Sequence, residues 1–141
     1  MPRATSVRTV PDPPDTVWAA LADHEGMATW LPGLKVQVTK PGNPEPNGVG
    51  AIRKAGIGSP GPIVEEITAF EPGHRLAYRA LAGVPLRNYR GEVTLRPSGS
   101  GTEISYAIET DQRLPIGEPQ LIKGMASVLL GGLVRGVKAR S

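Results

Sequence analysis

The stretch YRGEVTLRPSGSGTEISY, residues 89–106, decides the fold. Apolar residues stand at every second position on both sides of a turn-forming segment, which is the pattern of two half-buried strands joined as a hairpin. A turn centred on Gly99 and Ser100 sets the register, and the polar residues between the apolar ones then form the solvent face. Three pairs are predicted on the inner face: Leu95 with Ile104, Val93 with Tyr106, and Gly91 with Ile108.

The same alternation extends outward through the middle of the chain. Strands bounded by turn residues are predicted at 34–40, 48–55, 63–70, 75–82, 86–96 and 102–110. One further strand is predicted at residues 3–10, RATSVRTV. The loops between the six successive strands are too short for crossover helices, so the sequence predicts an antiparallel meander.

Helical patterns flank the strands. Residues 11–23, PDPPDTVWAALAD, predict a helix whose prolines stand at its start, and residues 24–33, HEGMATWLPG, predict a short second helix. Residues 119–140 predict a long C-terminal helix. Its predicted apolar side includes Leu121, Ile122, Met125, Ala126, Leu129, Gly132, Leu133, Gly136 and Val137, whereas Gly124 and Gly131 fall outside that side.

Composition limits the classes of function. A chain of 141 residues with 39% hydrophobic content fits one domain, residues 1–141. The net charge of +3 comes without a basic run, and the chain has only two tryptophans, three tyrosines and one phenylalanine, so a nucleic-acid partner is not expected. With no cysteine and two histidines, neither a metal site nor a cofactor is expected.

The sequence also bears on location. The N-terminus lacks the apolar segment of a secretory signal, and the uncharged run at residues 124–134 is about half the ~20 residues that a membrane span needs. We therefore expect a cytoplasmic protein without an integral membrane segment.

A charged pair is predicted on the inner face of the sheet. If the loop GIGSPGP, residues 56–62, is centred on Ser59, Arg53 lies opposite Glu65. The turn FEPGHR at residues 70–75 predicts Ala69 opposite Leu76 on this face. If Gly83 and Val84 form the next turn, Tyr78 lies opposite Tyr89, and Arg87 falls on the same face, as does Tyr106. Buried charges are costly unless they are paired or face a wetted cavity. A register shifted by one residue would instead expose Arg53 and Glu65, and the sequence leaves both registers open.

This order of elements resembles the SRPBCC superfamily, the START-like helix-grip domains of polyketide cyclases, lipid-transfer proteins and birch-pollen-type allergens. The resemblance covers nearly the whole chain and rests on residues 10–33, on EEITAFEPGHRLAY at 65–78, and on the hairpin at 89–106. It implies an α+β fold in which a curved antiparallel sheet of about seven strands wraps around the C-terminal helix. Two short helices follow the first strand, and a hydrophobic cavity lies between the sheet and the long helix.

The resemblance implies that the cavity binds a polyketide-, aromatic- or lipid-like small molecule. Three functions stay open: a polyketide cyclase or dehydratase, a non-catalytic lipid or quinone carrier, and a protein-interaction module. In the enzyme, Arg53 and the tyrosines would stabilise enolate charge and Glu65 would transfer protons. The predicted ligand-binding residues are Trp30, Ile67, Tyr78, Arg87, Tyr89, Tyr106, Met125, Leu129 and Gly132, with Gly132 enlarging the cavity because it has no side chain. A homodimer is a further expectation.

Overall fold

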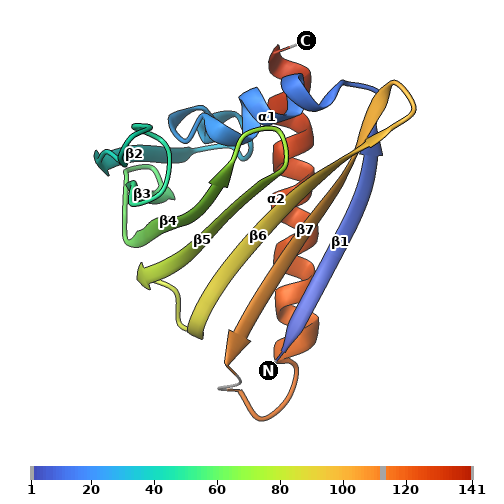
Figure 1. Cartoon of the computed structure of the whole chain (residues 1–141). Coiled ribbons are helices and arrows are strands. Elements are labelled where there is room, and N and C mark those ends of the chain that lie inside the picture. Colours follow the sequence, from blue (N-terminus) through green and yellow to red (C-terminus); the bar gives the residue numbers. More distant parts are fainter. Residues whose placement is uncertain (1, 112–113, 141) are drawn as a thin grey trace.

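An open sheet of seven antiparallel strands curves around one long helix (Figure 1). The computed structural model of the chain describes residues 2–111 and 114–140. The strands are β1 (Arg3–Val10), β2 (Leu34–Lys40), β3 (Ile52–Ile57), β4 (Ile63–Glu71), β5 (Arg75–Ala82), β6 (Arg87–Ser98) and β7 (Gly101–Asp111). Their order across the sheet is β1-β7-β6-β5-β4-β3-β2, so the predicted meander is confirmed, with β1 added beside β7.

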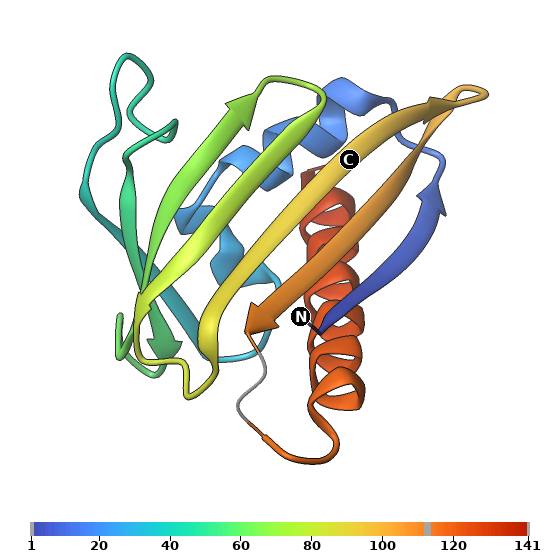
Figure 2. The same ribbon diagram turned by 60° about the horizontal axis from the view of Figure 1, so that its bottom comes forward.

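The helices also confirm the predicted order. α1 (Pro14–Ala22) begins with a proline, which costs nothing there because the first N–H of a helix has no partner inside the helix. The short 3₁₀ helix η1 (Glu25–Thr29) follows, and α2 (Glu118–Arg140) closes the fold. Figure 2 shows α2 crossing the concave side of the sheet, where it contacts β1, β7, α1 and η1.

The hairpin of β6 and β7 has the predicted register. Ser98 pairs with Gly101, which leaves Gly99 and Ser100 as the turn, and Gly99 has the positive φ of 60° that such a turn requires. All three predicted inner pairs form: Leu95 with Ile104, Val93 with Tyr106, and Gly91 with Ile108.

Two other pairings differ from the prediction. Tyr78 lies opposite Gly91 instead of Tyr89, a shift of two residues that leaves both tyrosines on the inner face. Ala69 lies opposite Ala77 instead of Leu76, because the register of β4 against β5 shifts between Ile67 and Ala69. β3 also begins at Ile52, four residues after the predicted start.

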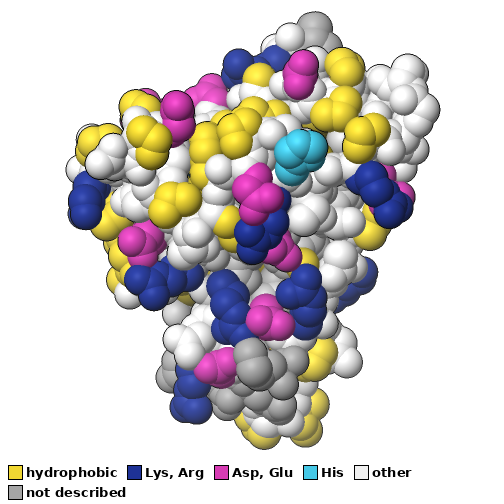
Figure 3. All heavy atoms as spheres, viewed as in Figure 1, with side chains coloured by type: hydrophobic (Ala, Val, Ile, Leu, Met, Phe, Trp, Pro, Cys, Tyr) yellow, Lys and Arg dark blue, Asp and Glu magenta, His cyan; other side chains and the backbone are white. Residues whose placement is uncertain are grey.

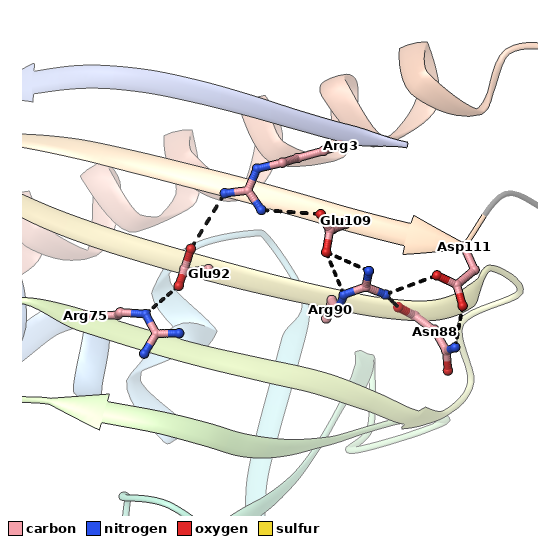
Figure 4. Close-up of polar contacts among 7 residues, drawn as sticks. All are labelled: Arg3, Arg75, Asn88, Arg90, Glu92, Glu109 and Asp111. Carbon is pink, nitrogen blue, oxygen red and sulfur yellow. Dashed lines mark hydrogen bonds and ion pairs between the residues drawn. The ribbon is translucent and has the colours of Figure 1, made fainter. Parts of the chain in front are cut away.

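The convex face of the sheet is polar. In the space-filling view, basic and acidic side chains lie beside one another over this face (Figure 3). Arg90 donates to Glu109 at 2.6 Å, and Arg75 donates to Glu92 (Figure 4). These side chains are 28–38% exposed, and surface ion pairs contribute at most about 1 kcal/mol each to stability.

α2 has the length and composition of a membrane span, with a mean hydropathy of 1.2 over its most apolar stretch. However, 44% of that stretch is buried inside the fold, and core helices of soluble proteins share these properties. Its buried side includes Ile122, Ala126, Leu130, Leu133, Val134 and Val137. These residues give α2 a role as the central helix that the sheet surrounds.

Candidate functional site

A cavity of about 910 Å³ lies between the sheet and the N-terminal half of α2. Met27 of η1, Leu31 after η1, and Leu121, Met125, Val128 and Leu129 of α2 line the helical side, and Ala55, Ile57 and Ile63 line the sheet side. Binding sites for small organic molecules have volumes of roughly 300–1,000 Å³ and mainly apolar walls. The cavity therefore has the size and the surface of a small-molecule site.

The mouth of the cavity is apolar. Ile57 at the end of β3 is 70% exposed, and Val128 and Leu121 on α2 are 52% and 45% exposed. All three line the cavity, so the cavity reaches the surface between β3 and α2. This largely apolar edge, where Gln120 is an exposed polar lining residue, is a route by which an apolar ligand can enter.

Arg53 and Glu65 form a buried ion pair in the cavity wall. Neighbouring strands β3 and β4 place the two residues directly opposite each other, and the guanidinium Nε donates to Glu65 Oε1 at 2.8 Å. Only 3% of Arg53 and 8% of Glu65 are exposed. The predicted inward register is therefore confirmed, and the register that would expose both residues is wrong.

A third member of this cluster, His24, was missed by the sequence analysis. Arg53 Nη1 lies 3.1 Å from His24 Nδ1, and Nε2 of the same ring lies 2.8 Å from the carbonyl oxygen of Asn47. A guanidinium can only donate, so Nδ1 accepts and the proton is on Nε2, which donates to Asn47. No sequence pattern links His24, between α1 and η1, to Arg53 in β3. The contact is therefore visible only in the tertiary structure.

His24 is neutral in the folded protein. The side chain is fully buried, and burial lowers the pKa from 6.5 to about 4, with the positive charge of Arg53 adding to the effect. The imidazole therefore holds the guanidinium in place without adding charge to the cluster.

This environment predicts acid sensitivity. Between pH 6.5 and 4 the unfolded chain binds a proton at His24 that the folded protein does not. The His24 contribution to the free energy of unfolding is therefore fully present above pH 6.5 and falls as the pH drops toward 4. We expect the His24 contribution to the free energy of unfolding to fall by about 2 kcal/mol between pH 8 and pH 5. Urea unfolding should show a weaker pH dependence in His24→Gln than in the unmodified protein. His74→Gln is the control, because His74 lies exposed in a turn, and an unchanged slope in His24→Gln would contradict the assignment.

Three tyrosine hydroxyls meet beside the ion pair. Tyr78 Oη lies 2.7 Å from Tyr106 Oη and 3.5 Å from Tyr89 Oη, and the Arg53 guanidinium lies 4.8 Å from the centre of the Tyr78 ring. Gly91 makes room for this ring, since a Cβ at Gly91 would lie 2.4 Å from Tyr78 Cζ. All three tyrosines line the cavity, as predicted.

Burial keeps these phenols protonated. It raises the pKa of Tyr89 to about 12, and it raises the pKa values of Tyr78 and Tyr106 as well. The tyrosines are therefore neutral hydrogen-bond donors. They can hold a carbonyl oxygen or stabilise an enolate.

Arg87 does not belong to this cluster. It is exposed and does not line the cavity. The register of β6 against β7 shifts between Arg87 and Arg90, and Asn88 adopts a positive φ of 50°. This irregularity interrupts the alternation, so the prediction that Arg87 faces the cavity is wrong.

Ile67 also lies outside the cavity lining. It is 1% exposed and packs in the core, with its backbone N–H bonded to Ala51. Its inward direction was predicted correctly, but this part of the inner face is filled by other side chains. Met125 and Leu129, in contrast, line the cavity as predicted.

Trp30 and Gly132 pack against each other instead of facing the ligand space. A Cβ on Gly132 would lie 2.8 Å from Trp30 Cβ, and one on Gly136 would lie 2.8 Å from Trp30 Nε1. Both glycines thus let α2 approach the tryptophan closely. The α2 glycine that lines the cavity is Gly124, which the helical pattern had placed outside the apolar side.

In the part of the chain that the structure describes, no group of three or more His, Asp or Glu side chains is placed to hold a metal ion. The cluster of Arg53, Glu65 and the tyrosines instead combines donors, one carboxylate and apolar surroundings. Such a site can orient a polar oxygen of an otherwise apolar molecule.

Comparisons with known proteins agree with this geometry. The model of a family described as "Polyketide cyclase / dehydrase and lipid transport" matches residues 1–139. None of the curated protein sequences compared with the chain matches it significantly.

Solved structures share the fold. A START superfamily protein from Mycobacterium smegmatis is 15% identical with a TM-score of 0.75. Ara h 8.0201 is 16% identical with a TM-score of 0.73. The first alignment covers 98% of this chain and 95% of the mycobacterial protein. The second covers 97% of this chain and 95% of Ara h 8.0201. DynU16, a putative protein in the dynemicin biosynthetic locus, is 22% identical with a TM-score of 0.71, and the match covers 98% of this chain and 48% of DynU16. At these identities the likeness establishes the fold alone.

Proposed function

Because the chain belongs to the polyketide cyclase/dehydrase and lipid transport family, we propose that it binds a polyketide-, aromatic- or lipid-like small molecule between the sheet and α2. The observation that carries this proposal is the cavity of about 910 Å³, which has apolar walls and a polar cluster of Arg53, Glu65 and three tyrosines. A module that binds only other proteins needs no such cavity, so ligand binding is favoured over that alternative. The cytoplasmic location and the homodimer stay predictions.

Filling the cavity from α2 tests the proposal. A Cβ on Gly124 meets no atom within 4 Å, so Gly124→Trp is expected to fold and to place its ring in or across the ligand space. We expect at least about tenfold weaker binding of 2-acetylnaphthalene, measured by isothermal titration calorimetry.

The matched control is Gly131→Trp. Gly131 is in the same helix and does not line the cavity, and an added Cβ would come no closer than 3.9 Å to Arg135. This variant should bind like the unmodified protein. Equal affinities of the two variants would place the ligand elsewhere. Native mass spectrometry of the purified protein would in addition reveal a co-purified apolar compound.

Catalysis is the finer part of the proposal. Arg53 and the neutral tyrosines would stabilise an enolate formed from a poly-β-ketone, and the Glu65 carboxylate would transfer the proton. Both charged residues line the cavity, which supports their contact with a ligand. Loss of turnover of a poly-β-ketone thioester in Glu65→Gln, with ketone binding retained, would support an enzyme. Binding without turnover in the unmodified protein would support a carrier.

A further inference from the structure

The charged cluster in the cavity wall has no net charge, and we propose that it selects ligands with a neutral carbonyl oxygen and rejects carboxylates. This inference rests on the proposed function, because it assumes that the cavity binds small molecules. It concerns the chemical class of the ligand: a ketone or an ester on an apolar body, as opposed to a fatty or aromatic acid.

The charge balance follows from the contacts. The single positive charge of Arg53 is paired with the single negative charge of Glu65 at 2.8 Å. These two are the charged residues among the described residues that line the cavity. His24 accepts from Arg53 as a neutral ring, and the three tyrosines stay protonated. A ligand therefore meets a site that is polar and electrically neutral.

A carboxylate would be unfavourable in such a site. A buried arginine by itself would attract an anion, but Glu65 already neutralises Arg53 and would repel a second carboxylate. The anion would also lose its hydration on entering the apolar cavity, and no unpaired positive charge would offset that desolvation cost.

A neutral carbonyl oxygen, in contrast, can accept hydrogen bonds from groups in the cavity wall. The three tyrosines have three hydroxyl hydrogens but make two hydroxyl-to-hydroxyl contacts, so one hydrogen is left for a ligand. Arg53 has five N–H groups, of which one bonds Glu65 and one bonds His24. A ketone can accept from these groups at a small desolvation cost.

Three ligands of the same shape test the inference on the unmodified protein. They are 2-acetylnaphthalene, which is a neutral ketone, 2-naphthoate, which is a carboxylate at pH 8, and 2-ethylnaphthalene, which has no oxygen. We expect calorimetry at pH 8 to show the ketone binding about tenfold more tightly than either of the others. A carboxylate that binds as tightly as the ketone, or a hydrocarbon that does, would overturn the charge selectivity while leaving cavity binding intact.

A substitution of Glu65 should remove the discrimination against carboxylates. Glu65→Gln keeps an oxygen that can accept from Arg53 but leaves the guanidinium charge unbalanced, so 2-naphthoate should bind at least about tenfold more tightly than to the unmodified protein. Glu66→Gln is the control, because it changes the net charge equally on the next residue of β4, where Glu66 pairs with Arg79 on the outer face. An unchanged affinity of folded Glu65→Gln for 2-naphthoate would contradict the inference.

The outcomes separate the two proposals. If none of the three naphthalenes binds the unmodified protein, the proposed function fails, and the inference fails with it. If they bind without the expected order, only the inference fails. Should Glu65→Gln not fold, the ligand series on the unmodified protein still decides.

Discussion

Replacing Glu65 with leucine is expected to lower the free energy of unfolding by about 3–5 kcal/mol. The substitution would leave the Arg53 guanidinium buried at 3% exposure without its carboxylate partner. His24 cannot replace that partner, because its ring is neutral and supplies a single acceptor. Urea unfolding at pH 8, monitored by circular dichroism, measures the loss.

The double variant Arg53→Leu/Glu65→Leu is the control. If the loss comes from an unpaired buried charge and not from altered packing, removing both charges should restore most of the stability, since buried ion pairs can often be replaced by apolar residues at little cost. A single variant within about 1 kcal/mol of the unmodified protein would contradict the buried pairing. The stable double variant should also show a weaker preference for ketones over hydrocarbons, because only the tyrosine hydroxyls are then left to donate to the ketone.

Gly132→Leu is expected to destabilise the fold by about 1–3 kcal/mol or to prevent folding. The first added atom would already lie 2.8 Å from Trp30 Cβ and 3.3 Å from Trp30 Cγ, and neither atom is the free end of a flexible side chain. Trp30 is 2% exposed and has little space to move. Thermal and urea unfolding of the purified variant would measure the effect.

Gly131→Leu is the matched control for this prediction. It makes the same change one residue earlier in α2, where the nearest atom to an added Cβ is 3.9 Å away. Without a clash, the higher helix propensity of leucine should stabilise α2 by about 0.5–1 kcal/mol. If both variants were stabilised, the close packing of Gly132 on Trp30 would be disproved.

The strand pattern could be predicted because alternation is a local property. The register of the hairpin at 89–106 followed from its turn position and from the period of two along each strand. The same reasoning gave the pairing of Arg53 with Glu65 as one of two open registers, and the structure has that register. Tyr78, Tyr89 and Tyr106 were placed inward for the same reason, even though Tyr78 lies opposite Gly91 and not Tyr89. A shift of two residues changes the partner and leaves the face unchanged.

The errors arose where a local irregularity or a contact between distant elements decides the outcome. Arg87 is exposed because the register of β6 shifts just after it, and no residue pattern marked that shift. Gly132 lies on the apolar side of α2 as predicted, but helical phase cannot tell a filled interior from an open cavity. His24, in the connection between α1 and η1, reaches Arg53 only because the tertiary fold brings this connection to β3.

The sequence by itself determined the order of strands and helices and the inward residues of the hairpin at 89–106, because periodicity and turn chemistry act over a few residues. For Arg53 and Glu65 the sequence left two registers open, and the pairing of β3 with β4 decided between them. Tertiary structure alone decided which inward residues line the cavity. The volume of the cavity depends on how closely α2 packs against Trp30 at Gly132 and Gly136, and on which side chains fill the rest of the interior. Packing of this kind joins residues far apart in the chain, so no local pattern records it.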